Sequence, residues 1–153
     1  MRLALIQPEI PQNVGAILRL GACLGVGVDL VGPLGFVTSD KRMRRAGMDY
    51  IDLADMRQHG SWDAFVRNAS GRLVLFTTKG ADSLYGFEFN ASDVLMFGSE
   101  SAGAPEYVHE AADARLRVPM RAETRSLNIA LSAALALGEG LRQTNGLPKE
   151  IQT

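Results

Sequence analysis

Apolar residues in this chain gather in short runs that are separated by polar, glycine-rich or proline-containing segments. Short apolar runs that stop at such residues are typical of buried strands. The expected strands cover Arg2–Gln7, Val28–Val31, Tyr50–Leu53, Leu73–Thr77, Val94–Gly98 and Arg115–Pro119. The expected helices lie between or after them and cover Val14–Leu24, Lys41–Ala46, Ser61–Asn68, Pro105–Ala111 and Leu127–Arg142. Because strands alternate with helices, the pattern predicts an α/β fold with a parallel sheet flanked by helices.

Three polar residues stand where helices are expected to begin. Asn13, Ser61 and Ser126 each precede a helical segment, and side chains of these types favour the N-cap position. Gly25 and Gly27 are expected to end the first long helix, because glycine tolerates the conformations that stop one.

The chain has the length of one ordinary domain, which we assign to residues 1–145. Residues 146–153 are rich in polar residues with Gly146 and Pro148, and we expect this tail to be frayed. No apolar run approaches the roughly 18 to 20 residues of a membrane span, and the apolar stretch at the start is too short for a signal peptide. We therefore expect a soluble, cytoplasmic protein with no membrane partner.

Positive charge is concentrated in one place although the net charge is only −1. Four cations lie within five positions: Lys41, Arg42, Arg44 and Arg45. Such a cluster is a candidate patch for contacting nucleic-acid phosphates. The alternative is a solvated helix face, because Asp40 and Asp49 flank the cluster.

The single cysteine and the two histidines carry no obvious chemistry. Cys23 lies in an apolar, helix-like stretch and is interpreted as a small buried hydrophobic residue. His59 and His109 lie in polar surroundings near expected helix ends, where we expect them at the surface. Neither has a second ligand-type residue at metal-binding spacing, so no metal site is predicted.

Segments that follow strand ends are the places where ligands bind in open α/β sheets. The first runs from Pro8 to Arg19. Arg19 has only small residues at helical contact spacing and no acidic partner there, so another backbone, a ligand or a second subunit could approach this face. The alternative is an arginine that faces solvent and an Asn13 that only caps the helix.

The second segment, residues 94–105, is an apolar strand that runs into a glycine-rich loop with one acid, Glu100. Gly98 would let a cofactor approach the backbone, although a plain strand-to-helix turn is the alternative. The third segment, residues 118–128, is a strand end and a polar loop that leads to Ser126 and Asn128. In the helix beyond it, Gly138 and Gly140 indicate close packing of another backbone, such as a partner subunit.

Taken together, the three segments resemble the three ordered motifs of the SPOUT superfamily of RNA methyltransferases, and more narrowly the branch that 2′-O-methylates ribose. The resemblance runs from Met1 to about Gln143. Two further stretches, residues 40–50 and Thr77-Thr78-Lys79-Gly80, look like the subgroup that acts on the wobble cytidine or uridine of leucine tRNAs.

The resemblance implies a C-terminal trefoil knot, a homodimer that buries the first and last helices, and a bent S-adenosylmethionine, released as S-adenosylhomocysteine. The residues that match the family's functional set are Asn13, Arg19, Glu100, Ser126 and Asn128. The positions that match its cofactor contacts, largely backbone groups, are Phe76, Gly98, Val118, Met120, Ser126 and Leu127. The anticodon stem-loop of tRNA would then lie on the cluster from Lys41 to Arg45.

A guanidinium is a poor general base because its pKa lies above 12. We therefore expect Arg19 to fix the ribose hydroxyl and stabilise developing alkoxide charge. Three other functions stay open: the same chemistry on another tRNA or rRNA ribose, an RNA-binding module without catalysis, and an α/β protein that binds an unrelated small nucleotide. The retained Arg19 and Glu100 argue against the second, and the missing glycine-rich phosphate loop after the first strand argues against the third.

Overall fold

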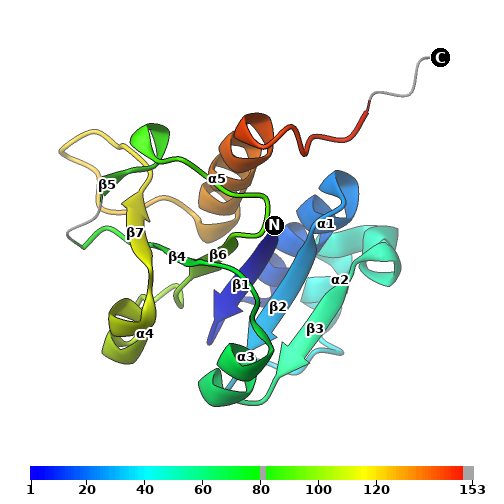
Figure 1. The fold of residues 1–153 in the computed structure, drawn as a ribbon. Helices are drawn as coiled ribbons and strands as arrows, with labels where there is room; N and C mark the ends of the chain where they lie inside the picture. The colour runs from blue at the N-terminus through cyan, green and yellow to red at the C-terminus, as the bar shows by residue number, and fades with distance from the viewer. Residues whose placement is uncertain (80–81, 150–153) are drawn as a thin grey trace.

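Apolar parallel strands form the centre of the protein in the computed structural model, which describes residues 1–79 and 82–149 (Figure 1). Within these residues the strands are β1 Arg2–Ile6, β2 Gly27–Val31, β3 Met56–His59, β4 Leu73–Phe76, β5 Asp82–Ser83, β6 Val94–Phe97 and β7 Ala114–Arg117. They form one sheet in the order β3-β2-β1-β6-β4-β7-β5, and every pairing is parallel. The predicted α/β fold with a parallel sheet is therefore confirmed.

Helices cover both faces of this sheet because alternate residues of each strand point to opposite sides. Leu3 and Leu5 of β1 face a core that includes residues of α1 Pro11–Leu24, α2 Lys41–Gly47 and α5 Ile129–Gln143. Ala4 and Ile6 face a smaller core on the other side, under α3 Trp62–Asn68 and α4 Glu106–Ala111.

Two edge segments differ from the prediction. Residues 50–53 are not a strand but part of a 3-10 helix, η1 Met48–Leu53, in which Ile51 packs against Gly47. The strand lies further along, at β3, whose residues are mostly exposed. An edge strand has only one neighbour to pair with, so its sequence Met-Arg-Gln-His carries little apolar signal. The short β5 and the 3-10 helix η2 Leu84–Gly86 were also not predicted.

The helix caps agree with the prediction at one position and differ at two. Ser61 caps α3, since its Oγ accepts from the Ala64 amide at 3.2 Å. Helix α1 begins earlier than predicted, at Pro11, whose missing amide hydrogen costs nothing in a first turn. Asn13 therefore lies inside α1 and does not cap it. Helix α5 is capped by Asn128 and not by Ser126.

The cysteine and the histidines are placed differently from the prediction. Cys23 is exposed because the apolar side of α1 is made by residues such as Val14, Ile17 and Leu18. The His59 side chain is only 9% exposed, and its Nε2 lies 2.8 Å from Asp29 Oδ1. His109 is also buried, on the inner side of α4.

Of the two glycines in α5, only Gly140 packs against other residues of the same chain. A Cβ on Gly140 would meet Met1 and Phe89, whereas one on Gly138 would meet nothing within 4 Å. The predicted close approach of another backbone is therefore not seen at either glycine within one protomer.

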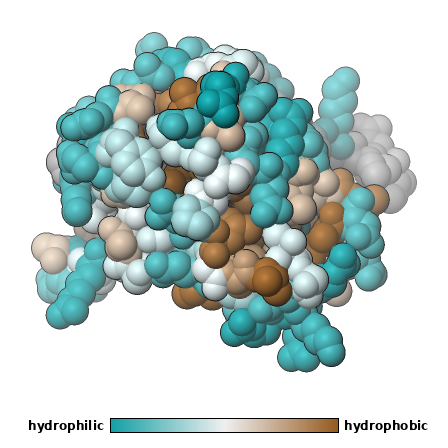
Figure 2. All heavy atoms as spheres, turned by 90° about the horizontal axis from the view of Figure 1, so that it is seen from below, coloured by the Kyte–Doolittle hydropathy of each residue, from teal (hydrophilic) through white to brown (hydrophobic). Residues whose placement is uncertain are grey.

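Polar side chains cover most of the surface when the molecule is viewed from below, and the largest group of apolar side chains lies near the lower centre of that view (Figure 2). Among the described residues, no helix combines the length and the apolar character that a membrane crossing requires. The predicted frayed tail lies partly outside these residues, from position 150 onward.

Candidate active-site cavity

A cavity of about 510 Å³ opens beyond the carboxyl ends of β1, β6, β4 and β7. After β1 the chain crosses to α1 on one face of the sheet, and after β6 it crosses to α4 on the other face. The divergence of these two loops leaves a crevice, the usual ligand position in open α/β sheets. The volume lies within the range of about 300–1,000 Å³ that small-molecule sites occupy.

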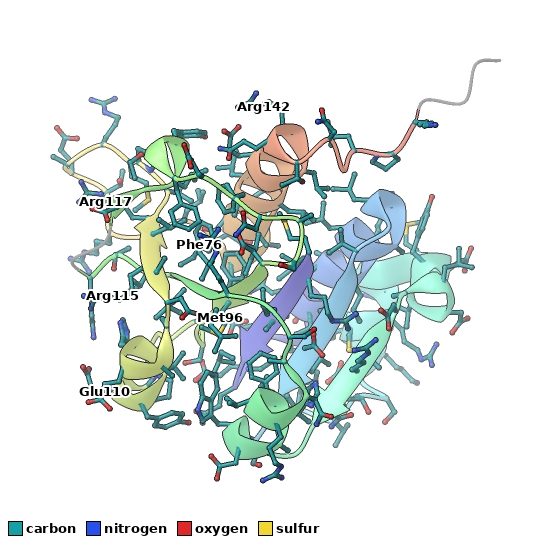
Figure 3. The ribbon with its side chains drawn as sticks, in the orientation of Figure 1. Phe76, Met96, Glu110, Arg115, Arg117 and Arg142 are labelled. Carbon is teal, nitrogen blue, oxygen red and sulfur yellow. The ribbon has the colours of Figure 1, made fainter. Side chains whose placement is uncertain are left out.

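All six positions predicted to contact a cofactor line this cavity. They are Phe76, Gly98, Val118, Met120, Ser126 and Leu127. Phe76 stacks on Phe97 with the ring centroids 5.0 Å apart and the planes 13° from parallel. Figure 3 shows Phe76 in the interior of the molecule, whereas Arg115 and Arg117 lie at its periphery. The cavity therefore joins aromatic and aliphatic walls to polar loop groups.

Gly98 is required by the way the loop after β6 folds back on itself. The backbones of Ser99 and Gly103 bond to each other in both directions, at 3.1 and 2.9 Å. A Cβ on Gly98 would lie 2.1 Å from the Ala104 amide nitrogen, so any larger residue would push the loop open. Gly103 has a φ of 72°, a conformation that favours glycine.

The Glu100 carboxylate holds the start of α1. It accepts from the backbone amides of Glu9 at 2.9 Å and Ile10 at 3.2 Å, and from Asn13 Nδ2 at 3.2 Å. A negative charge at this position also complements the positive end of the helix dipole. Because three donors already occupy this carboxylate, the geometry makes Glu100 an organiser of the cavity wall.

Glu9 makes the reciprocal contact, which was not anticipated from the sequence. Its carboxylate accepts from the Ser101 hydroxyl at 2.7 Å and from the Ser101 amide at 3.2 Å. The loops after β1 and β6 thus each supply a carboxylate that binds the other loop. The two contacts link residues more than 90 positions apart, so no local sequence pattern could have revealed them.

Asn13 and Asn128 bring the third segment into the same network. Asn128 Nδ2 donates to Asn13 Oδ1 at 3.1 Å, and Asn128 Oδ1 accepts from the Ala130 amide at 2.8 Å to cap α5. The predicted residues Asn13, Glu100, Ser126 and Asn128 therefore all line one cavity.

Arg19, in contrast, is not among the residues that line the cavity. It lies six positions beyond Asn13, about 9 Å further along the helix axis. Its Nη1 is 3.0 Å from Met48 Sδ, and its guanidinium lies 5.1 Å from the centre of the Tyr50 ring. The small-residue face predicted beside it is filled by α2, since a Cβ on Gly15 would lie 2.2 Å from the Met43 carbonyl oxygen.

The four cations of the basic cluster are all exposed on α2. Arg42 is paired with Asp40 at 2.9 Å, and hydrogen bonds from Arg42 hold the pKa of the Asp40 carboxyl below its usual value. Arg44 lies 3.8 Å from Asp52. Within the described residues, Lys41 and Arg45 are in no ion pair, so they carry the least compensated charge.

Further residues of the cavity wall were not singled out from the sequence as site residues. Thr77, Thr78 and Lys79 follow β4 and line the cavity, as does the buried His109. Gly80, the last residue of the predicted Thr77-Thr78-Lys79-Gly80 stretch, lies outside the described residues. Across residues 1–79 and 82–149, no group of three or more His, Cys, Asp or Glu residues is arranged to hold a metal ion.

Comparison with known proteins gives consistent matches over nearly the whole chain. Residues 1–138 match the SpoU rRNA Methylase family. A tRNA (cytidine(34)-2′-O)-methyltransferase of Ancylobacter novellus is 51% identical over 152 residues, which cover 97% of this chain and 96% of that protein. The enzyme of the same name from Photorhabdus asymbiotica is 40% identical, with 94% and 93% covered.

Solved structures agree with these matches. One described as "Structural insights into the 2-OH methylation of C/U34 on tRNA" superposes with a TM-score of 0.90 at 41% identity, covering 95% of this chain and 96% of that one. A SpoU methyltransferase of Streptomyces viridochromogenes in complex with the cofactor AdoMet has a TM-score of 0.81 at 26% identity, and the match covers 94% of this chain and 57% of that one.

Proposed function

The chain belongs to the SpoU rRNA Methylase family, and from this premise we propose that it 2′-O-methylates the ribose of the wobble nucleotide, position 34, of tRNA with S-adenosylmethionine as methyl donor. The observation that carries the proposal is the cavity in which residues of all three predicted motifs meet. Relatives named tRNA (cytidine(34)-2′-O)-methyltransferase support the choice of target, among them one that is 51% identical with 96% of its length covered.

The walls of the cavity suit a bent adenosine-containing cofactor. A flat adenine needs apolar surfaces on its two faces, and Val118, Leu127 and the stacked Phe76 and Phe97 are apolar wall residues. The folded-back loop from Gly98 to Ala104 lines the space, where its backbone groups would contact the cofactor. We further propose that the segment around α5 forms the trefoil knot of the family.

When bound, S-adenosylmethionine supplies an electrophilic methyl group on a sulfonium. The residues of the chain must then hold the ribose in line with it and keep the 2′-oxygen close, because orientation is the main source of rate in such a transfer. Ser126 and Asn128 lie at the cavity and would orient the nucleotide. Arg19 would donate to the 2′-oxygen and stabilise its growing negative charge.

Arg19 lies outside the cavity of its own chain, so we propose that a homodimer completes the site. In it, Arg19 of one protomer reaches the cavity of the other. Helix α5 presents Leu131 and Leu135 to solvent at 56% and 43% exposure, which gives the dimer an apolar surface to bury. This arrangement would account for an arginine that matches the family motif yet lines no cavity within one chain.

The cations on α2 would bind phosphates of the anticodon stem-loop, with leucine tRNAs as the proposed substrates in the cytoplasm. Lys41, Arg42, Arg44 and Arg45 are exposed and lie on the helix packed against α1, the helix that carries Arg19. A phosphate patch beside the catalytic arginine would place the substrate and the reacting hydroxyl together.

The test is transfer of labelled methyl groups to tRNA from cells that lack this activity, with rRNA from the same cells as a second substrate. We expect labelled 2′-O-methylcytidine or 2′-O-methyluridine from tRNA and no label in rRNA. Label in rRNA alone would mean that the protein is a methyltransferase whose substrate is rRNA and not tRNA. Failure to bind the cofactor in calorimetry would overturn the methyltransferase function itself.

A further inference from the structure

We propose that Tyr50 and Met48, in the 3-10 helix after the basic helix, are positioning residues that fix the direction of the Arg19 guanidinium. The inference rests on the catalytic role proposed for Arg19. It assigns a function to the second half of the 40–50 stretch, whereas the cations proposed to bind phosphates lie in the first half.

The Tyr50 ring forms one support for Arg19. The guanidinium carbon lies 5.1 Å from the ring centroid, within the distance of about 6 Å at which a cation is attracted to an aromatic face. The ring is only partly exposed, so its own orientation is restricted by its surroundings. A planar cation stacked on a held ring loses most of its rotational freedom about the side-chain bonds.

Met48 forms the second support, and its backbone is strained. Its φ of 52° and ψ of −144° fall in a region that is essentially restricted to glycine. In this conformation its Sδ lies 3.0 Å from Arg19 Nη1. The sulfur and the ring hold the guanidinium at two different atoms, which sets its direction as well as its place.

The packing around Met48 explains how such a conformation is maintained. Helix α2 lies so close to α1 that a Cβ on Gly15 would be 2.2 Å from the Met43 carbonyl oxygen. Gly15 is four positions before Arg19, on the same side of α1. Met48 is the residue at which α2 ends and the chain turns toward Arg19. Its amide still donates to the Arg44 carbonyl.

A natural sequence with only packing needs would place glycine at this position. Strained residues that persist are concentrated at functional sites, where the surrounding structure over-determines them. The methionine side chain itself is 54% exposed, so burial of apolar surface does not explain its presence. Its contact with Arg19 does.

The experiment compares Tyr50→Leu, Tyr50→Phe, Met48→Gly and Arg19→Ala, with Tyr85→Leu as the matched control, since Tyr85 is also a tyrosine on a 3-10 helix. The readouts are kcat, KM for tRNA, S-adenosylhomocysteine affinity by calorimetry, and Tm. We expect the kcat of Tyr50→Leu to fall by about two-fold to thirty-fold, which corresponds to the loss of a cation–π contact. The KM for tRNA and the S-adenosylhomocysteine affinity should stay unchanged. Tyr50→Phe, which keeps the ring, should retain most of the wild-type kcat.

Met48→Gly separates positioning from folding. Removal of the strain should leave Tm equal or higher, while kcat falls because the sulfur contact is lost. If Arg19→Ala lowers kcat but Tyr50→Leu and Met48→Gly match the Tyr85→Leu control, the positioning role is wrong and the proposed function stands. If Arg19→Ala itself retains its kcat, the failure lies in the role proposed for Arg19.

Discussion

Asn128 donates from Nδ2 to Asn13 Oδ1 at 3.1 Å and so joins two residues that are 115 positions apart in the chain. Asn13 in turn donates to Glu100, and Asn128 caps α5 with its own oxygen. Each asparagine side chain uses both its amide nitrogen and its oxygen. This arrangement locks the loops after β1 and β6 to the start of α5, and the candidate cavity lies among them.

Replacement of Asn13 tests this junction. We expect Asn13→Asp to be worse than Asn13→Ala, because the aspartate would place a second carboxylate about 3 Å from Glu100, where like charges repel. Removal of the two bonds should cost about 1–3 kcal/mol of unfolding free energy, measured by denaturant titration, and should weaken S-adenosylhomocysteine binding. If Asn13→Asp is as stable as the wild type, the bond to Glu100 is not formed as described.

The contact between Glu9 and Ser101 gives a finer test of the loop pairing. Ser101→Ala removes the hydroxyl that donates to Glu9 at 2.7 Å, whereas Ser101→Thr keeps a hydroxyl at the same position. We expect the alanine variant to lose about 1 kcal/mol of cofactor binding free energy, because a charge-assisted hydrogen bond at an exposed site is only modestly stabilising. Equal affinities of the two variants in calorimetry would mean that the loop needs no such support.

Arg19→Ala tests the division of the site between two protomers. Turnover should fall by at least 100-fold, while S-adenosylhomocysteine affinity stays within about two-fold, because the cavity of each chain does not contain Arg19. Mixing Arg19→Ala with a second inactive variant, Gly98→Val, whose loop cannot close, should restore activity. Random pairing gives about a quarter of the wild-type number of intact sites. If mixing restores nothing, each protomer must use its own arginine.

The ion pairs on α2 predict that its four cations are not equivalent for RNA binding. Arg42 is held by Asp40, so its replacement should matter least. Replacing Lys41 and Arg45 together should weaken tRNA binding and reduce the slope of log affinity against log salt by about 1.5. The matched control is Arg142→Ala, a cation paired with Glu139 at the far end of α5. A salt slope that is unchanged in the double variant would exclude this helix from the RNA interface.

The buried strands and the positions of the three site segments could be predicted from the sequence, because apolar runs and helix signals are local. The partners within the site could not be. Pro11 starts α1 before Asn13, so Asn13 is free to bond to Glu100, and that consequence depends on a residue 87 positions away. Likewise β3 carries polar residues because it is an edge strand, and its place in the sheet is a tertiary property.

His59 shows the same limit on the other face of the sheet. Its sequence neighbours are polar, which indicated a surface residue, yet Asp29 of β2 bonds to it from the adjacent strand. Asp29 is buried, and the His59 side chain is only 9% exposed. Arg2 completes the group. Burial would lower the pKa of its guanidinium, but the hydrogen bonds that the guanidinium donates to Asp29 and Asp55 outweigh burial and raise that pKa. Strand order decided these contacts, and the sequence pattern did not contain it.

The most direct test of methylation at position 34 uses two synthetic anticodon stem-loops of a leucine tRNA, or the matching full-length tRNAs, that differ only in the 2′-hydroxyl of nucleotide 34. The enzyme and labelled S-adenosylmethionine are incubated with each, and the incorporated methyl groups are counted. We predict incorporation approaching one methyl per molecule with the ribose form and none with the 2′-deoxy form. Equal incorporation into both would contradict the proposal, because the methyl group would then be going to another atom.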